Sequence, residues 1–318
     1  MVRLVTFGHI HAISQCLFDS TSLQMLQEEN QICRLPPELL GQIFRDAVFP
    51  PSEPDAYRSS PNYRSLTSPY SISHVCRQWR DTALNYSLLW TRLSIKNPND
   101  SELVNLLEVW MDRAGSLPLS FDLRVFKIKS KFATKAILRL FINSVHRCRD
   151  VTLVLASLSP NLIDMENLSL QHPYLLQNAT IEFADKPNAK FDFLFNHIFS
   201  APNLRSAKFF CEHQISLDKV APSWSNLQDL TVDVFSPALL ISALAFCRNL
   251  KQLTISDTRT AGRIPIRPIT LPQLTHLSVS MGVCPSFFDN LLVPSLKEVH
   301  IQNVEGKSWG HLIRLLER

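Results

Sequence analysis

Five segments between residues 201 and 302 repeat one hydrophobic pattern at a nearly constant spacing. Their first leucines are 23, 23, 24 and 22 residues apart, at Leu204, Leu227, Leu250, Leu274 and Leu296. After each leucine, apolar and polar residues alternate, as at Leu230, Val232 and Val234, which turns one face of a β-strand inward. A unit this short cannot bury that face alone, so the spacing predicts a stack of strand-containing units.

Helical patterns alternate with strand patterns along most of the chain. Further strands are predicted at 118–125, 150–156 and 178–184, and helices at 100–115, 134–148, 191–199, 236–247, 285–292 and 308–318. Ser236 is a candidate N-cap, and Gly115 is expected to end the first of these helices. Alternation from about residue 93 onward predicts right-handed βα units and a parallel sheet, and therefore an α/β fold.

The repeated L-x-x-L-x-L pattern resembles that of leucine-rich repeats. The resemblance implies an irregular leucine-rich-repeat solenoid with a curved parallel sheet. The asparagine or cysteine that usually follows the strand is replaced by Glu212, Phe235, Thr258, Gly282 and Val304. We therefore expect no asparagine ladder and less regular turns. The alternative is a generic α/β domain with evenly spaced strands.

Residues 34–93 contain short amphipathic helical patterns instead. RLPPELLGQIF places prolines in the first turn of a helix, where a backbone N–H is not needed. Its apolar stripe comprises Leu39, Leu40, Ile43 and Phe44, and a second helical face is predicted to contain Ile72, Val75, Cys76 and Trp79. A third segment has Ala83, Leu84, Leu88 and Trp90 as apolar anchors. Helices this short need a partner or neighbouring helices to cover their apolar faces.

Three blocks in this stretch, in order, resemble an F-box. The matching residues are Leu35, Pro36, Pro37, Glu38, Leu39, Leu40, Ile43, Phe44, Val75, Cys76, Arg77, Trp79, Arg80, Ala83, Leu84, Leu89, Trp90 and Leu93. The chain departs from the compact pattern by a polar insertion, which we expect to be a loop at about 49–71. The resemblance implies a three-helix module at 31–93 that binds a SKP-type adaptor, which bridges to a cullin–RING ubiquitin ligase. Residues 1–30 would then be a leader, and 94–318 the repeat domain.

The adaptor-binding residues implied by the resemblance come from all three blocks. They are Leu35, Pro36, Leu39, Leu40, Ile43, Phe44, Val75, Trp79, Leu84 and Trp90. Trp79 is also a candidate for holding the helices together. Substrate contacts are expected from exposed strand positions, namely Gln228, Thr231, Asp233, Lys251, Thr254, His276 and Lys297.

No motif of known catalytic chemistry occurs in the sequence, which has only seven glycines and no C-x-x-C. We therefore predict a protein without enzymatic activity, cofactor or metal. Seven scattered cysteines favour a reducing cytoplasmic or nuclear compartment, and no apolar run is long enough for a membrane helix. A basic stretch is interpreted as a solvated face, with an acidic protein surface as the alternative ligand: Arg124, Lys127, Lys129, Lys131, Lys135 and Arg139.

A net charge of +4 gives no reason to expect a nucleic-acid partner. The sequence thus favours a substrate-recruiting F-box subunit of a SKP–cullin–F-box ubiquitin ligase with an unknown protein substrate. The alternative is a stand-alone leucine-rich-repeat scaffold without a role in ubiquitin transfer.

Overall fold

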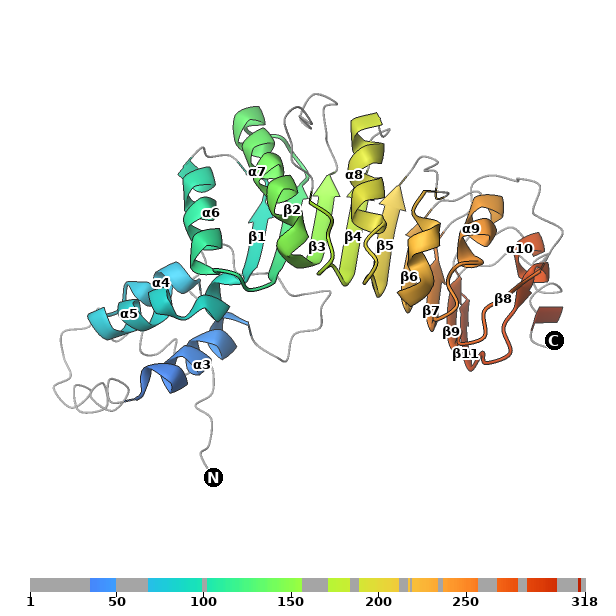
Figure 1. Cartoon of the computed structure of the whole chain (residues 1–318), viewed down its shortest axis with the longest axis horizontal. Coiled ribbons are helices and arrows are strands. Elements are labelled where there is room, and N and C mark those ends of the chain that lie inside the picture. Colours follow the sequence, from blue (N-terminus) through green and yellow to red (C-terminus); the bar gives the residue numbers. More distant parts are fainter. Residues whose placement is uncertain are drawn as a thin grey trace. The chain divides into compact units, whose positions relative to one another are not determined.

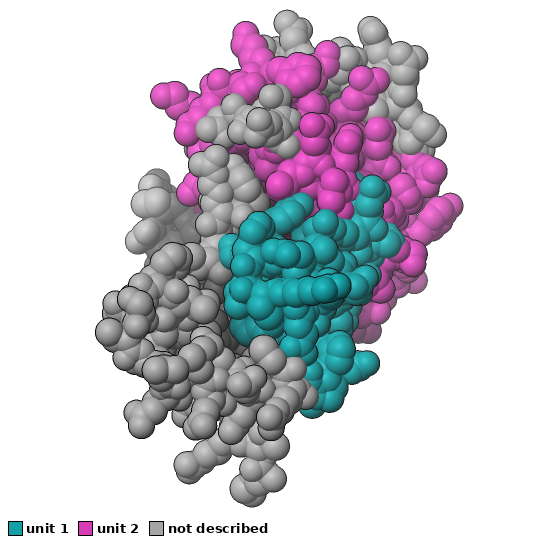
Figure 2. Space-filling view, turned by 90° about the vertical axis from the view of Figure 1, so that its left-hand side faces the viewer, with its two compact units in different colours: residues 1–91, 111–115 teal, residues 92–110, 116–318 magenta. Residues whose placement is uncertain are grey.

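The computed structural model describes most of the chain between residues 35 and 315. The described ranges are 35–49, 68–98, 102–155, 171–183, 189–211, 217, 219–233, 237–256, 268–279, 285–301 and 314–315. The leader, the candidate N-cap Ser236, the five residues that replace the usual asparagine, and most of the helix expected at 308–318 lie outside these ranges. The chain forms two compact units (Figure 2): unit 1 is 1–91 with 111–115, and unit 2 is 92–110 with 116–318.

Among the described residues 35–49 and 68–91, unit 1 contains short α-helices and a 3-10 turn (Figure 1). These are α3 (Pro37–Val48), α4 (Pro69–Ser73), α5 (Arg77–Asn85) and η1 (Ser87–Trp90). Pro36 and Pro37 begin α3 as expected, and Glu38 lies in its first turn, near the positive end of the helix dipole. The buried side chains of Leu40, Phe44, Ala83, Leu89 and Trp90 form the core of the unit.

Two local predictions for unit 1 are wrong. The apolar face from Ile72 to Trp79 does not belong to one helix, because α4 ends at Ser73 and the extended Cys76 precedes α5. The expected loop at 49–71 is also too long, since α4 begins at Pro69. The hydroxyl of Ser68 accepts a hydrogen bond from the amide N–H of Ser71 and so caps that helix.

Unit 2 contains a nine-stranded sheet in which every neighbouring pair is parallel. Its strands follow one another in chain order (Figure 1): β1 (Arg92–Lys96), β2 (Leu119–Val125), β3 (Cys148–Leu155), β4 (Asn178–Phe183), β5 (Ser206–Cys211), β6 (Asp229–Asp233), β7 (Gln252–Ile255), β9 (His276–Val279) and β11 (Glu298–Ile301). The predicted α/β fold is confirmed, and the arrangement is that of a solenoid resembling leucine-rich repeats. Two short strands, β8 (Ile269–Thr270) and β10 (Leu291–Leu292), form a separate parallel pair.

Helices cover the apolar face of this sheet (Figure 1). They are α6 (Glu102–Arg113), α7 (Lys131–Ser144), α8 (Ala189–Phe199), α9 (Pro237–Leu244) and α10 (Pro285–Asp289), with η2 (Val145–Arg147) and η4 (Ala221–Asn226) as 3-10 turns. Phe121 of β2 contacts Phe141 of α7 with ring centroids 4.9 Å apart, and Phe209 of β5 contacts Phe199 of α8 at 5.4 Å. The prediction of one helix over 285–292 is wrong, because α10 ends at Asp289 and two leucines that follow pair with β8.

A ladder of side-chain amides runs along the turns before strands β5, β6, β7 and β9. Asn203, Asn226 and Asn249 each donate to a backbone carbonyl of the preceding unit, at Tyr174, Pro202 and Ser225, over 2.7, 3.0 and 2.8 Å. In the following repeat the Gln273 amide donates to Asn249 Oδ1. In the last repeat the Ser295 hydroxyl donates to the backbone carbonyl of Pro272, as the Asn226 amide does to that of Pro202. These bonds satisfy turn carbonyls that the sheet leaves unpaired. The prediction that no asparagine ladder forms concerns the turns after the strands, which lie outside the described residues, so it stays a prediction.

Candidate protein interaction surfaces

An apolar ridge lies on the outer side of α3 in unit 1. Leu39 is 48 % exposed and Ile43 is 41 % exposed, one helical turn apart, and Pro36 before them is also exposed. The adjacent stripe of Leu40 and Phe44 is buried. Since α3 has two parallel apolar stripes and the unit covers one, the other remains available to a partner. We call Pro36, Leu39 and Ile43 the α3 ridge.

The buried stripe is held by an aromatic cluster. The ring of Phe44 contacts Trp79 at a centroid distance of 4.8 Å, and Tyr70 contacts Trp90 edge to face at 5.1 Å. Arg113, which belongs to this unit, places its guanidinium carbon 4.6 Å from the centre of the Trp90 ring. The indole N–H of Trp90 donates to the backbone carbonyl of Ala83 at 2.8 Å, so this buried donor is satisfied.

Burial divides the residues expected to contact an adaptor into three groups. Pro36, Leu39, Ile43 and Val75 are exposed, whereas Leu35, Trp79 and Leu84 are half-buried. Three are fully buried and pack the unit instead: Leu40, Phe44 and Trp90. A partner that docks on the folded unit would therefore contact the first group and would be supported indirectly by the third.

Burial also acts on the one phenol of this cluster. It raises the pKa of the Tyr70 hydroxyl above its usual value, and the nearby positive charge of Arg113 offsets part of that rise. Tyr70 is therefore uncharged at neutral pH, and the cluster presents a cation facing neutral aromatic rings.

A groove of about 620 Å³ lies beside the beginning of α3, along the outer face of α5. Its lining is Pro37, Glu38, Arg77, Gln78, Asp81, Thr82, Asn85 and Tyr86. Gly41 allows α3 to approach this region closely, since a Cβ added there would lie 2.7 Å from the Tyr86 ring. Gly41 is not among the residues expected to matter for binding. Its position between two apolar pairs of a helical pattern is nevertheless a signal of close packing, because glycine disfavours a helix interior.

The open face of the unit 2 sheet is mostly polar, with Val154 and Phe210 as apolar members of one row. Strand register aligns its side chains into rows, and the middle row consists mainly of hydroxyl side chains: Ser94, Asp122, Thr152, Thr180, Lys208, Thr231, Thr254, Ser278 and His300. Of the expected substrate-binding residues, Thr231, Asp233, Thr254 and His276 lie on this face. The other three lie one position before the strands, at Gln228, Lys251 and Lys297.

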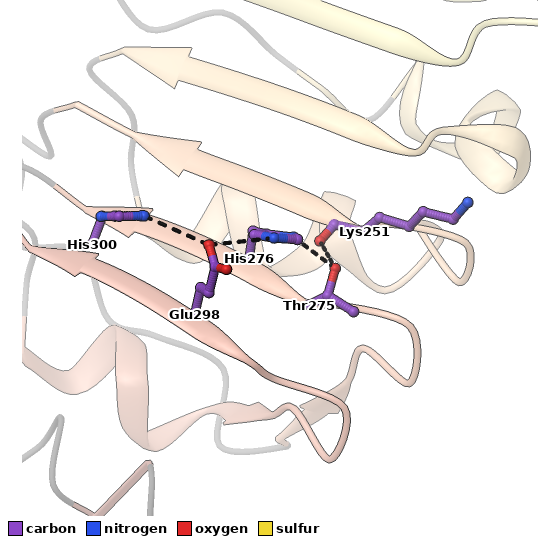
Figure 3. Close-up of polar contacts among 5 residues, drawn as sticks. All are labelled: Lys251, Thr275, His276, Glu298 and His300. Carbon is purple, nitrogen blue, oxygen red and sulfur yellow. Dashed lines mark hydrogen bonds and ion pairs between the residues drawn. The ribbon is translucent and has the colours of Figure 1, made fainter.

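Figure 3 shows the polar contacts at the last strands of this face. The hydroxyl of Thr275 donates to the Lys251 carbonyl at 3.1 Å and lies 2.8 Å from His276 Nδ1. On its other side, His276 Nε2 lies 3.4 Å from Glu298 Oε2, and His300 Nε2 lies 3.8 Å from the same oxygen. One carboxylate oxygen of Glu298 is therefore shared by two imidazoles.

Two carboxyl groups on the open face have pKa values above the usual range. Burial raises the pKa of Asp122, while hydrogen bonding and the charge of Arg124 oppose the rise. Burial likewise raises the pKa of Asp229, against the opposing charges of Lys208 and Lys251. Desolvation thus outweighs attraction at both of these carboxyl groups.

Residues 32–96 match the model of the F-box-like family. The match includes α3, α4, α5, η1 and the strand β1. A search of curated proteins finds no match for the chain. No helix among the described residues is long and apolar enough to cross a membrane. Within the same residues, no three His, Cys, Asp or Glu side chains gather in a way that could hold a metal ion.

Proposed function

We propose, from the F-box-like segment at residues 32–96, that this chain recruits substrates to a SKP–cullin–F-box ubiquitin ligase. Unit 1 would bind a SKP-type adaptor, and through it a cullin–RING ligase, while unit 2 would bind the protein to be modified. The chain would then perform no chemistry of its own. It would raise the local concentration of a target near the ubiquitin-charged enzyme.

The α3 ridge is the observation that carries this proposal. Within the matched segment, two large apolar side chains stand exposed one turn apart on a helix whose neighbouring stripe is already buried. Covering a large apolar side chain contributes about 1.5–3 kcal/mol when it is fully exposed beforehand, and proportionally less for Leu39 and Ile43. Helix-in-groove docking uses apolar anchors at this spacing.

Co-purification with a SKP-type adaptor tests the proposal. The wild-type chain should bind, and Leu39→Ala with Ile43→Ala should weaken binding by about 2 kcal/mol, roughly thirtyfold in Kd, while the helices remain folded. Phe132→Ala is the matched control, because Phe132 is 71 % exposed in unit 2 and its loss should leave adaptor binding unchanged.

A wild-type chain that is folded but retains no adaptor would refute the proposal and would favour the stand-alone scaffold. Equal loss of binding in the Phe132→Ala variant would show that the α3 ridge is not the contact. Unfolding of the double variant is monitored by circular dichroism, and the single variant Ile43→Ala serves if the double variant is unstable.

In unit 2, the proposed target contacts are the polar side chains of the open face and of the turns before the strands. Their support is geometric: the parallel register brings residues from separate repeats into continuous rows. Because backbone bonds of the sheet hold every row in place, side chains can be exchanged there at little cost in folding stability. This is the property expected of a surface that selects targets.

A further inference from the structure

Basic and uncharged residues alternate strictly at the start of seven neighbouring strands of the nine-stranded sheet, β3, β4, β5, β6, β7, β9 and β11. Each member immediately precedes its strand, except that the member at β3 is the second residue of that strand. The row reads Arg149, Gln177, Arg205, Gln228, Lys251, Thr275 and Lys297. A cation therefore occurs at every second strand, with an amide or hydroxyl side chain between. Some of these residues were expected to bind substrate, but the alternation appears only once register is known. We call this set the turn row.

Backbone hydrogen bonds fix the spacing of the turn row. The amide N–H of each member donates to the carbonyl of the member before it, over 2.7–2.9 Å from Gln177 through to Lys297. Neighbouring members are thus one strand apart, about 4.8 Å, and successive cations are about 9.6 Å apart. The backbone positions that bear the positive charges are therefore evenly spaced and fixed by the sheet.

A groove of about 310 Å³ accompanies the middle of the turn row. Its lining contains two cations and five amides and no carboxylate: Asn203, Arg205, Asn226, Gln228, Asn249, Lys251 and Gln273. The asparagine amides are held in place by the ladder described above, so the floor is rigid. Amides and cations around a narrow groove suit an extended chain with anionic side chains and polar backbone groups.

Carboxylates next to the turn row are already engaged. Asp150 accepts from Arg149 Nε at 3.2 Å, and Glu298 faces His276 and His300. Asp229 interacts with Lys208 as well as Lys251. Arg205 and Lys251 are exposed and line the groove, and they are the strongest candidates for receiving an external anion.

We propose that the turn row binds an extended acidic segment of the target protein with an anionic side chain at every third residue. In the polyproline II conformation, residues i, i+3 and i+6 share one face and are about 9.3 Å apart, which matches the spacing of about 9.6 Å between the row's cations. The anion is a carboxylate or a phosphate, since both accept bidentate bonds from arginine. This inference rests on the proposed function and names the class of target.

Nucleic acid is a poorer occupant of the same row. The next row of the sheet contains Asp150, Asp229 and Glu298, which would repel a continuous polyanion that spreads beyond the groove. Anionic side chains at intervals of three residues, by contrast, place charge only beside the cations.

Fluorescence anisotropy with labelled peptides tests the match in spacing. A peptide of repeated Glu-Pro-Pro triplets should bind the full chain at least several-fold more tightly than a peptide of the same composition with its glutamates grouped at one end. Added salt should weaken binding of the periodic peptide, because the contacts are exposed ion pairs. A periodic peptide with phosphoserine in place of glutamate distinguishes the two anions.

Arg205→Gln with Lys251→Gln should weaken binding of both periodic peptides by roughly tenfold. The control, Lys127→Gln with Lys131→Gln, removes the same charge from exposed residues next to α7 and should change Kd less than about twofold. Three results would overturn the inference. The grouped peptide could bind as tightly as the periodic one, or the control variant could lose as much affinity as the Arg205→Gln, Lys251→Gln variant. A DNA strand of the same charge could also bind as tightly as the periodic peptide and lose affinity in the same variant.

Adaptor binding of the same variants keeps the two proposals apart. The Arg205→Gln, Lys251→Gln protein should bind the SKP-type adaptor like the wild type, since both residues belong to unit 2. A wild-type chain that binds the adaptor but does not prefer the periodic peptide refutes only the turn row. A chain that recognises the periodic peptide but binds no adaptor refutes only the ligase role.

Discussion

The α3 ridge of unit 1 and the open sheet face of unit 2 are opposite kinds of surface. Unit 1 covers only one of the two apolar stripes of α3 and leaves Leu39 and Ile43 at the surface. Unit 2 covers the apolar face of its sheet with helices and presents rows of hydroxyl, amide and charged side chains. An apolar ridge suits one partner of fixed shape, whereas a polar lattice can discriminate among targets through the arrangement of charges. The difference predicts that the two units tolerate different substitutions.

The largest effect is expected in the core of unit 1. Trp90→Ala removes a fully buried ring and its hydrogen bond to Ala83, and it should lower the free energy of unfolding of this unit by about 3–5 kcal/mol. Hydrogen exchange should accelerate in α3 and α5. If strands β5 to β9 lose protection to the same extent, the two units do not fold separately and the comparison fails.

A smaller loss is expected at the close approach between α3 and Tyr86. Gly41→Ala places a methyl group 2.7 Å from the ring, and the resulting overpacking should cost about 1–3 kcal/mol. Thermal unfolding measures the loss, and Tyr86→Leu in the same chain should restore part of it. An unchanged melting temperature would mean that the ring moves aside freely and that the groove beside α5 is not rigid.

The strands of unit 2 could be predicted because alternation and regular spacing act over many residues. The pair β8–β10 escaped prediction because two residues are too few to show a period. In unit 1, Leu39–Leu40 and Ile43–Phe44 are adjacent apolar pairs, and nothing in their spacing says which stripe faces inward. The break before Cys76 was missed for a similar reason, since the pattern across it suits a continuous helix and contains neither glycine nor proline.

The site in unit 2 was predicted only in part. Exposed strand positions follow from alternation, so Thr231 and Thr254 could be found. The amide ladder was sought after the strands, where leucine-rich repeats usually have it, although Asn203, Asn226 and Asn249 stand directly before the first leucine of their repeats. The alternation of the turn row depends on register across units, which spacing alone does not define.

The ladder predicts a moderate effect confined to unit 2. Asn226→Ala removes the bond to the Pro202 carbonyl and should lower the free energy of unfolding by about 1 kcal/mol. Gln228→Ala, two residues away in the turn row, is the control and should stay within about 0.5 kcal/mol. Chemical denaturation distinguishes the two variants. Equal losses would mean that the ladder contributes no more than general packing of the turn.

The smallest expected effect is the change of folding stability at low pH, and it should differ between the two units. In unit 2, burial lowers the pKa of His197, with His172 nearby adding to the decrease and a hydrogen bond to the Gln171 carbonyl opposing it. The unfolded chain therefore binds more protons than the folded chain just below the ordinary histidine pKa. Stability from this group is complete above that pKa and decreases as the pH falls through it.

Because His197 is only partly buried, the decrease should be well under about 1 kcal/mol between neutral pH and pH 5.5. His197→Gln should flatten the pH dependence of unit 2 unfolding, while His74→Gln, at an exposed position in unit 1, should leave it unchanged. Hydrogen exchange at the two pH values, corrected for intrinsic rates, measures both. Acid sensitivity that persists in the His197→Gln variant would refute the assignment to His197. The open-face carboxyl groups Asp122 and Asp229 could not account for it, because their raised pKa values should stabilise the unit as the pH falls.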